Sequence, residues 1–169
     1  MAGEPSTVTL VSCAGCGLQL PNRALDLDAR SNSSGECRAV MHELSYYTLG
    51  HGDPRFIHQH LVDAYGAQHV RRSKSTIGAA FALAGLYLAV EREFTGRQVQ
   101  QMHMRMARRP RKWPLFDPPA ETWPVSVADV VAAEAGARRD RELMRWCASV
   151  WAGWLPQQQR VRAMVDPFL

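Results

Sequence analysis

IGAAFALAGLYLAV, residues 77–90, is the stretch that decides the fold class of this chain. It holds no charged residue, and glycine and alanine alone interrupt its large apolar side chains. Its 14 residues fall short of the roughly 20 that a helix needs to cross a bilayer, so it predicts a buried core helix. Small residues such as Ala80, Ala84 and Gly85 let neighbouring helices approach closely. We therefore place a helix over about residues 75–93 at the centre of a bundle.

Two helical segments precede this central one. Ser34 is a suitable N-cap for a helix over about residues 35–49. Asp53 followed by proline is a helix start signal and predicts a second helix over about residues 54–70. Because the connection at residues 50–53 is short, the two helices should form an antiparallel hairpin.

The C-terminal half predicts two further helices around a proline-rich loop. Residues 97–109 have the spacing of a short amphipathic helix, and residues 107–125 contain five prolines. Ser126 and Asp129 then resemble a capping box that starts the last long helix. Its apolar face is formed by Leu143, Cys147, Val150 and Trp154. The fold class is therefore all-α, a compact bundle of about five helices.

Length and composition fit one globular domain over residues 1–169. The chain is 46% hydrophobic and 21% charged, which excludes the disordered and fibrous classes. We expect a loop-rich segment over residues 1–34, followed by a helical bundle over residues 35–155. The N-terminus lacks the pattern of a secretory signal, so we expect a cytoplasmic protein that keeps its four cysteines reduced.

The net charge of +4 raises the question of nucleic-acid binding. One segment, between Phe94 and Phe116, has basic residues and no acidic ones. These are Arg97, Arg105, Arg108, Arg109, Arg111 and Lys112. A phosphate-binding patch is one interpretation, and a solvated helix end is the one we favour. We expect neither nucleic-acid nor membrane binding, and we expect the partner to be a small molecule or a protein.

Cysteine spacing gives the most specific functional signal. Cys13-x-x-Cys16-Gly17 has the spacing of a zinc knuckle. A redox motif of the same spacing would need an α/β pattern that this chain lacks. Zinc requires four ligands, so Cys37 is the third candidate and six histidines compete for the fourth place. Cys147 lies on the apolar face of the last helix and is expected to be a core thiol.

Hairpin geometry sorts the histidines. If the chain turns near residues 51–52, Cys37 approaches His69 and His42 approaches His58. Along one helix His58 and His69 would be about 16 Å apart, too far to share an ion. We therefore predict a metal site of Cys13, Cys16, Cys37 and His69. A second polar cluster would contain His42 and His58 with His60 or Asp63, and we favour its interpretation as hydrogen-bonded interhelical histidines.

Four further polar residues in or near these helices have possible roles outside metal ligation. Asp63 and Gln68 could orient a ligating imidazole, although a pair on the helix surface is equally consistent with the sequence. His51 is expected in a turn and His103 at the surface.

These motifs, in this order, resemble a bacterial protein family of unknown function. Its members show a CxxCG start, a later lone cysteine and a Tyr-x-x-Gln-His segment, matched here by residues 13–17, Cys37 and Tyr65 to His69. The tryptophan pattern at residues 146–154 and the motif at residues 126–130 are also similar. The resemblance implies recurrent cysteine and histidine positions and no established activity.

Two functions follow from these predictions. In the first, zinc pins the N-terminal segment to the helical hairpin of a binding or scaffold protein. In the second, the chain is a metal-dependent enzyme of specialised biosynthesis, which catalyses a cyclisation or hydrolysis assisted by a Lewis acid. His42, His58 or Asp63 would then be the catalytic acid or base in a histidine-lined pocket.

Overall fold

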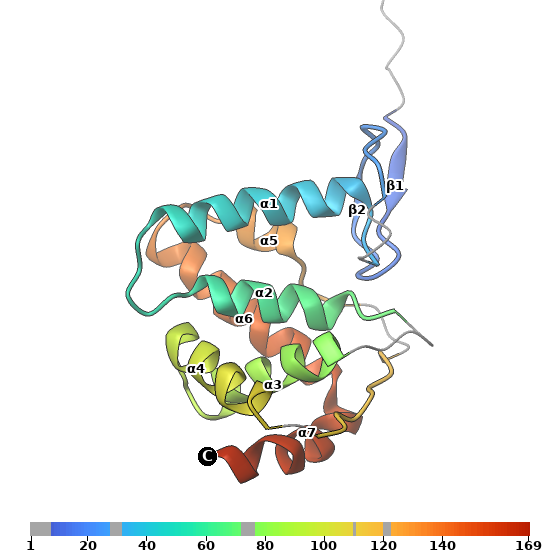
Figure 1. Ribbon diagram of the computed structural model, residues 1–169. Coiled ribbons are helices and arrows are strands. Elements are labelled where there is room, and N and C mark those ends of the chain that lie inside the picture. The colour runs from blue at the N-terminus through green and yellow to red at the C-terminus, as the bar shows by residue number, and fades with distance from the viewer. Residues whose placement is uncertain (1–7, 28–31, 72–76, 110, 120–122) are drawn as a thin grey trace, which may run out of the picture.

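The computed structural model describes residues 8–27, 32–71, 77–109, 111–119 and 123–169 (Figure 1). The described residues form seven α-helices and one two-stranded antiparallel sheet, which confirms the all-α fold class. The strands are β1 (Leu10–Ser12) and β2 (Gln19–Pro21); the helices are α1 (Gly35–Gly50), α2 (His58–Gln68), α3 (Ile77–Glu91), α4 (Gly96–Ala107), α5 (Val127–Ala132), α6 (Ala137–Gly153) and α7 (Gln158–Val165). Two 3-10 turns, Leu155–Gln157 and Asp166–Phe168, flank α7.

Helix α3 lies at the centre of the core, as its apolar sequence predicts. Leu83, Leu86 and Leu88 are fully buried, and α3 packs against α2, α4, α6 and α7. Four neighbours can surround one helix because its many alanines keep the interhelical distances short. Within the described part of the chain, no helix has the length and apolarity needed to span a membrane.

Helices α1 and α2 form the predicted antiparallel hairpin, side by side in Figure 1. Ser34 caps α1 by accepting a hydrogen bond from the Cys37 backbone N–H at 3.1 Å. Helix α2 begins at His58 and not at Pro54. Asp53 does cap a turn, since its carboxylate accepts from two following backbone N–H groups. Phe56 ends that turn with a φ of 57°, a left-handed conformation that interrupts the helix.

The described part of the C-terminal half contains four α-helices, α4 to α7, where two were expected, so the total is seven and not about five. Gly136, at a φ of 102°, separates α5 from α6 where one long helix was predicted. Helix α7 was not predicted. Its buried residues Val161, Met164 and Val165 pack against α3. The capping box of α5 is present as predicted, because Asp129 Oδ2 accepts from the Ser126 backbone N–H at 2.7 Å.

Part of the basic segment holds the C-terminus in place. Arg105 donates a hydrogen bond to the Phe168 carbonyl at 2.8 Å, and the guanidinium groups of Arg109 and Arg111 lie over the Phe168 ring. Arg97 lies in the same way over the Phe56 ring. These cations therefore have intramolecular partners, which favours a role in packing over a phosphate-binding patch.

Candidate metal centre

The CxxC motif lies in the turn between β1 and β2. The turn is closed by two backbone hydrogen bonds, from Cys13 N to the Leu18 carbonyl and from Gly17 N to the Cys13 carbonyl. Gly17 adopts a φ of 75°, which glycine tolerates at low cost. Cys13 and Cys16 are buried at the end of this short hairpin. The knuckle expected from the spacing is therefore formed on two strands, which three-residue segments could not reveal in the sequence.

The other two candidate ligands come from the helical hairpin. Cys37 lies in the first turn of α1 and is completely buried, and His69 is the residue directly after α2. In Figure 1 the end of α2, the start of α1 and the β1–β2 hairpin lie at the same side of the molecule. Three segments that are distant in sequence thus supply four buried ligand atoms.

These four side chains form one cluster. The ligand atoms of Cys13, Cys16, Cys37 and His69 all lie within 4.8 Å of one another. His69 Nε2 is 3.5 Å from the sulfurs of both Cys13 and Cys37, and the sulfurs of Cys16 and Cys37 are 3.8 Å apart. The cluster is geometrically able to bind a metal ion.

The backbone of α2 fixes the orientation of the His69 ring. The Nδ1 atom lies 2.8 Å from the Tyr65 carbonyl oxygen, which can only accept, so Nδ1 carries the proton. Nε2 is then the ring nitrogen that faces the sulfurs, and it is the atom that could bind a metal ion after losing its proton. The Tyr65 ring stacks on the His69 ring at a centroid distance of 3.9 Å, and its hydroxyl group donates to the Cys37 sulfur.

Hydrogen bonds within the cluster shift the pKa values of its members. Hydrogen bonds from the Cys16 and Cys37 thiols stabilise the Cys13 thiolate and place the pKa of Cys13 far below its ordinary value. The pKa of Cys37 is raised, because hydrogen bonds with Cys13 and Cys16 hold its proton. Burial alone would lower the pKa of His69, but hydrogen bonds with Cys13 and Cys16 raise it to about 9. The Cys13 thiolate is therefore held by the protons of Cys37 and His69, and a metal ion bound here would have to displace those protons.

The second predicted cluster is not assembled. His42 is exposed, while His58 Nδ1 lies 2.8 Å from the Thr48 hydroxyl oxygen. The pairs Cys37–His69 and Thr48–His58 are both centred on residue 53. The chain therefore turns later than the residues 51–52 assumed from the sequence, and His42 does not reach His58.

Asp63 and Gln68, the residues predicted to orient a ligating imidazole, form hydrogen bonds with other groups. Asp63 accepts from Gln59, and Gln68 bridges the Val125 carbonyl and the Trp146 indole, so neither of them orients His69. The orienting residue is Tyr65, which we did not predict, although its position four residues before His69 places both on one helix face.

Cys147, His51 and His103 lie outside both predicted clusters. Cys147 is a buried core thiol as predicted, and it contacts the His60 carbonyl at 3.6 Å. His51 is exposed in the expected turn. His103 is not a surface residue, because it is half-buried with its ring edge-on to Phe81.

Comparisons with known proteins place this chain in a family. Searches of curated proteins and of solved structures gave no match. Residues 11–155 match the sequence profile of DUF5946, described as a family of unknown function. The matched region includes all four residues of the candidate metal centre. Since the match covers most of the chain, this protein belongs to the DUF5946 family.

Proposed function

We propose that this protein binds one zinc ion through Cys13, Cys16, Cys37 and His69, and that the ion has a structural role. The observation that carries the proposal is the spacing of the ligand atoms. A tetrahedral ion with Zn–S bonds of about 2.3 Å and a Zn–N bond of about 2.0 Å requires S···S edges of about 3.8 Å and S···N edges of about 3.5 Å. Two S···N distances of 3.5 Å and one S···S distance of 3.8 Å, three of the six edges, match these values, and all four atoms lie within 4.8 Å of one another.

The ligand set supports a structural role over a catalytic one. Three cysteines and one histidine are a common closed set for structural zinc, whereas a catalytic zinc ion keeps one position for water or substrate. All four ligands are buried, and they join the β1–β2 hairpin to both α1 and α2. The ion would thus stabilise a segment that has little apolar surface of its own to bury.

The alternative function, a metal-dependent enzyme, stays a prediction. It requires an acid or base beside the metal, and the candidates lie elsewhere. His42 is exposed, His58 contacts Thr48, and Asp63 is enclosed between helices. None of these three residues has a hydrogen bond to a residue of the centre among the described contacts.

Metal analysis of purified variants tests the ligand set. We expect about one zinc ion per wild-type chain, and almost none in Cys37→Ala or His69→Ala. Cys147→Ala is the matched control, because it removes a buried thiol outside the cluster and should leave the zinc content unchanged. Equal zinc content in all four proteins would overturn the proposal.

Two further measurements separate a structural ion from a catalytic one. Cobalt substitution should give the visible spectrum of a tetrahedral Co²⁺ ion with thiolate ligands, and added azide or imidazole should not change it, because the shell is closed. Removal of the ion by a chelator should increase amide exchange over residues 10–21, while the far-UV signal of the helices is largely kept. A cobalt spectrum that responds to azide would favour the enzyme.

A further inference from the structure

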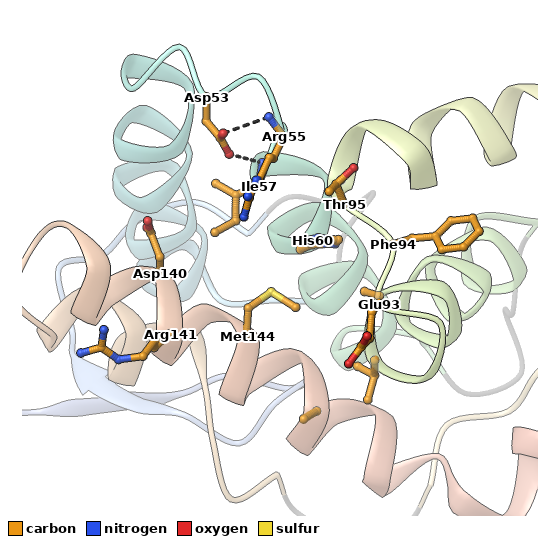
Figure 2. A pocket seen from close by; sticks show the side chains of 14 residues that line it. Asp53, Arg55, Ile57, His60, Glu93, Phe94, Thr95, Asp140, Arg141 and Met144 are labelled. Atoms are coloured by element: carbon orange, nitrogen blue, oxygen red, sulfur yellow. Dashed lines mark hydrogen bonds between the residues drawn. The ribbon is translucent and has the colours of Figure 1, made fainter.

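A cavity lies at the start of α2, near the predicted histidine cluster. It has a volume of about 980 Å³ and opens between the residues before α2, the α3–α4 connection and α6 (Figure 2). This volume is in the range that takes small organic ligands. Its apolar walls include Ile57, Val90, Phe94 and Met144.

One polar group within the cavity lacks a partner. His60 lines it and is only 5% exposed, and Figure 2 shows its side chain in the middle of the surrounding residues. Its Nδ1 atom is buried and makes no hydrogen bond with any residue that the structure describes. A buried, unsatisfied ring nitrogen costs stability, so its position calls for a partner that the described residues do not supply.

Burial keeps this ring uncharged. It lowers the pKa of His60 to about 4, although the negative charge of Asp53 acts in the opposite direction. A neutral imidazole has one donor and one acceptor nitrogen. A carboxamide or similar group, which both donates and accepts, complements it in either tautomer.

The charged residues at the rim do not select one sign of charge. Arg55 and Arg141 are opposed by Asp53, Glu93 and Asp140. Two of these acids are already engaged: Asp53 accepts from the backbone N–H groups of Arg55 and Ile57, and Asp140 accepts from the Tyr47 hydroxyl group. A mixed rim around apolar walls favours a ligand with an uncharged head group.

Backbone strain is concentrated at the same cavity. Three described residues other than glycine have positive φ, and two of them, Phe56 at 57° and Glu93 at 55°, belong to the segments that border it. The segments are also joined to each other, because Arg97 N donates to the Arg55 carbonyl at 2.8 Å. Strained residues held by firm contacts are typical of binding sites.

We propose that this cavity binds a small organic molecule that has an apolar ring and an uncharged hydrogen-bonding head group, which pairs with His60. The site is separate from the metal centre. His60 lies in the first turn of α2 and His69 directly after its last turn, nine residues later, which corresponds to roughly 13 Å along the helix axis. The ligand therefore does not contact the ion, and its binding does not depend on the proposed zinc function.

The test uses benzamide as the probe and benzoate, with the same ring and an anionic head, as its comparison. Both are titrated into uniformly ¹⁵N-labelled, zinc-loaded protein while the histidine ring nitrogens are followed by NMR. We expect benzamide to shift the His60 nitrogens in a saturable way, with contacts from its ring to the Met144 methyl group. Benzoate should bind at least about tenfold more weakly, one power of ten in Kd.

Two exposed alanines of α6 provide a matched pair of variants. Ala148 lines the cavity, and Ala152 lies one turn further along the helix outside it. Ala148→Trp should abolish the benzamide shifts, and Ala152→Trp should keep them. Three results would each overturn the proposal: no saturable shifts at His60, equal benzamide binding by Ala148→Trp and wild type, or tighter binding of benzoate than of benzamide. The contacts between the benzamide ring and Met144 test the proposal in the wild-type protein, without any variant.

Discussion

Gly15 lies against the candidate metal centre in a space that admits no side chain. A Cβ at this position would collide with the Asn32 carbonyl oxygen and with the His69 ring. A residue with a side chain would not fit in the middle of the CxxC turn, because the His69 ring lies directly over it.

We predict that Gly15→Ala lowers the free energy of unfolding by about 1–3 kcal/mol, the usual cost of overpacking, and weakens zinc retention. Chemical denaturation and the rate of zinc transfer to a chromogenic chelator measure the two effects. Gly50→Ala is the control, because nothing lies within 4 Å of a Cβ there. Similar behaviour of the two variants would show that the close approach to His69 has no energetic consequence.

The sequence was sufficient to predict the four members of the candidate centre. The CxxC spacing identifies Cys13 and Cys16, and the hairpin brings Cys37 to His69 even when the turn is misplaced by one or two residues. The same error makes the predicted contact between His42 and His58 wrong, because a contact between two single side chains depends on the exact register of the two helices. The role of Gly15 could not be predicted, since it follows from a contact between residues 54 positions apart in the chain.

At the scale of the elements, the contact between α2 and α3 depends on one unusual pair. The buried Asp63 carboxyl group lies directly against Gly85, where a Cβ would collide with it. Its Oδ2 atom has no hydrogen-bond partner among the described residues, and burial raises the pKa of this carboxyl group well above its ordinary value.

We predict that Gly85→Ala destabilises the protein by about 1–3 kcal/mol, because Asp63 cannot move out of the interface. In an Asp63→Ala background the same substitution should cost at least about 1 kcal/mol less, since the collision is gone. A double-mutant cycle based on urea denaturation measures this difference. Strict additivity would mean that the carboxyl group moves aside freely.

Elements with a long apolar stretch or a helix start signal were predicted, and those with neither were not. The segment of α3 is apolar throughout, and α1 begins at the cap that Ser34 provides. Helix α7 has only eight residues and lies between Pro156 and Pro167, so its buried positions Val161, Met164 and Val165 did not form a recognisable period. The two strands have three residues each, too few to show alternation.

At the scale of the whole molecule, the buried His60 and the half-buried His103 make the free energy of unfolding depend on pH. Burial lowers the pKa values of His60 and His103 to about 4, and one ring nitrogen of each is buried without a partner among the described residues. An unfolded chain protonates histidine near pH 6.5. Between pH 6.5 and 4 the unfolded state therefore binds more protons than the folded state, so stability falls as the pH is lowered through this window.

We predict that His60 alone accounts for a loss of about 2 kcal/mol between pH 7 and pH 5, the value given by pKa values of 6.5 unfolded and about 4 folded. His60→Gln should reduce the loss by about that amount, and His103→Gln should reduce it in the same direction. Urea denaturation at the two pH values measures it. His42→Gln is the control, because water solvates this exposed side chain in the folded and unfolded chain alike.

The comparison between variants is needed because other groups titrate in the same window. Acid displaces zinc from cysteine and histidine ligands and lowers stability, whereas the raised pKa of Asp63 works in the opposite direction, since the folded state holds that proton longer. Both contributions are common to wild type and the histidine variants, so they cancel in the difference. The result that would contradict this prediction is an equal loss of stability between pH 7 and pH 5 in wild type, His60→Gln and His42→Gln. The His60 ring would then be protonated in the folded protein without cost, and the neutral, enclosed imidazole that the proposed ligand site requires would not exist.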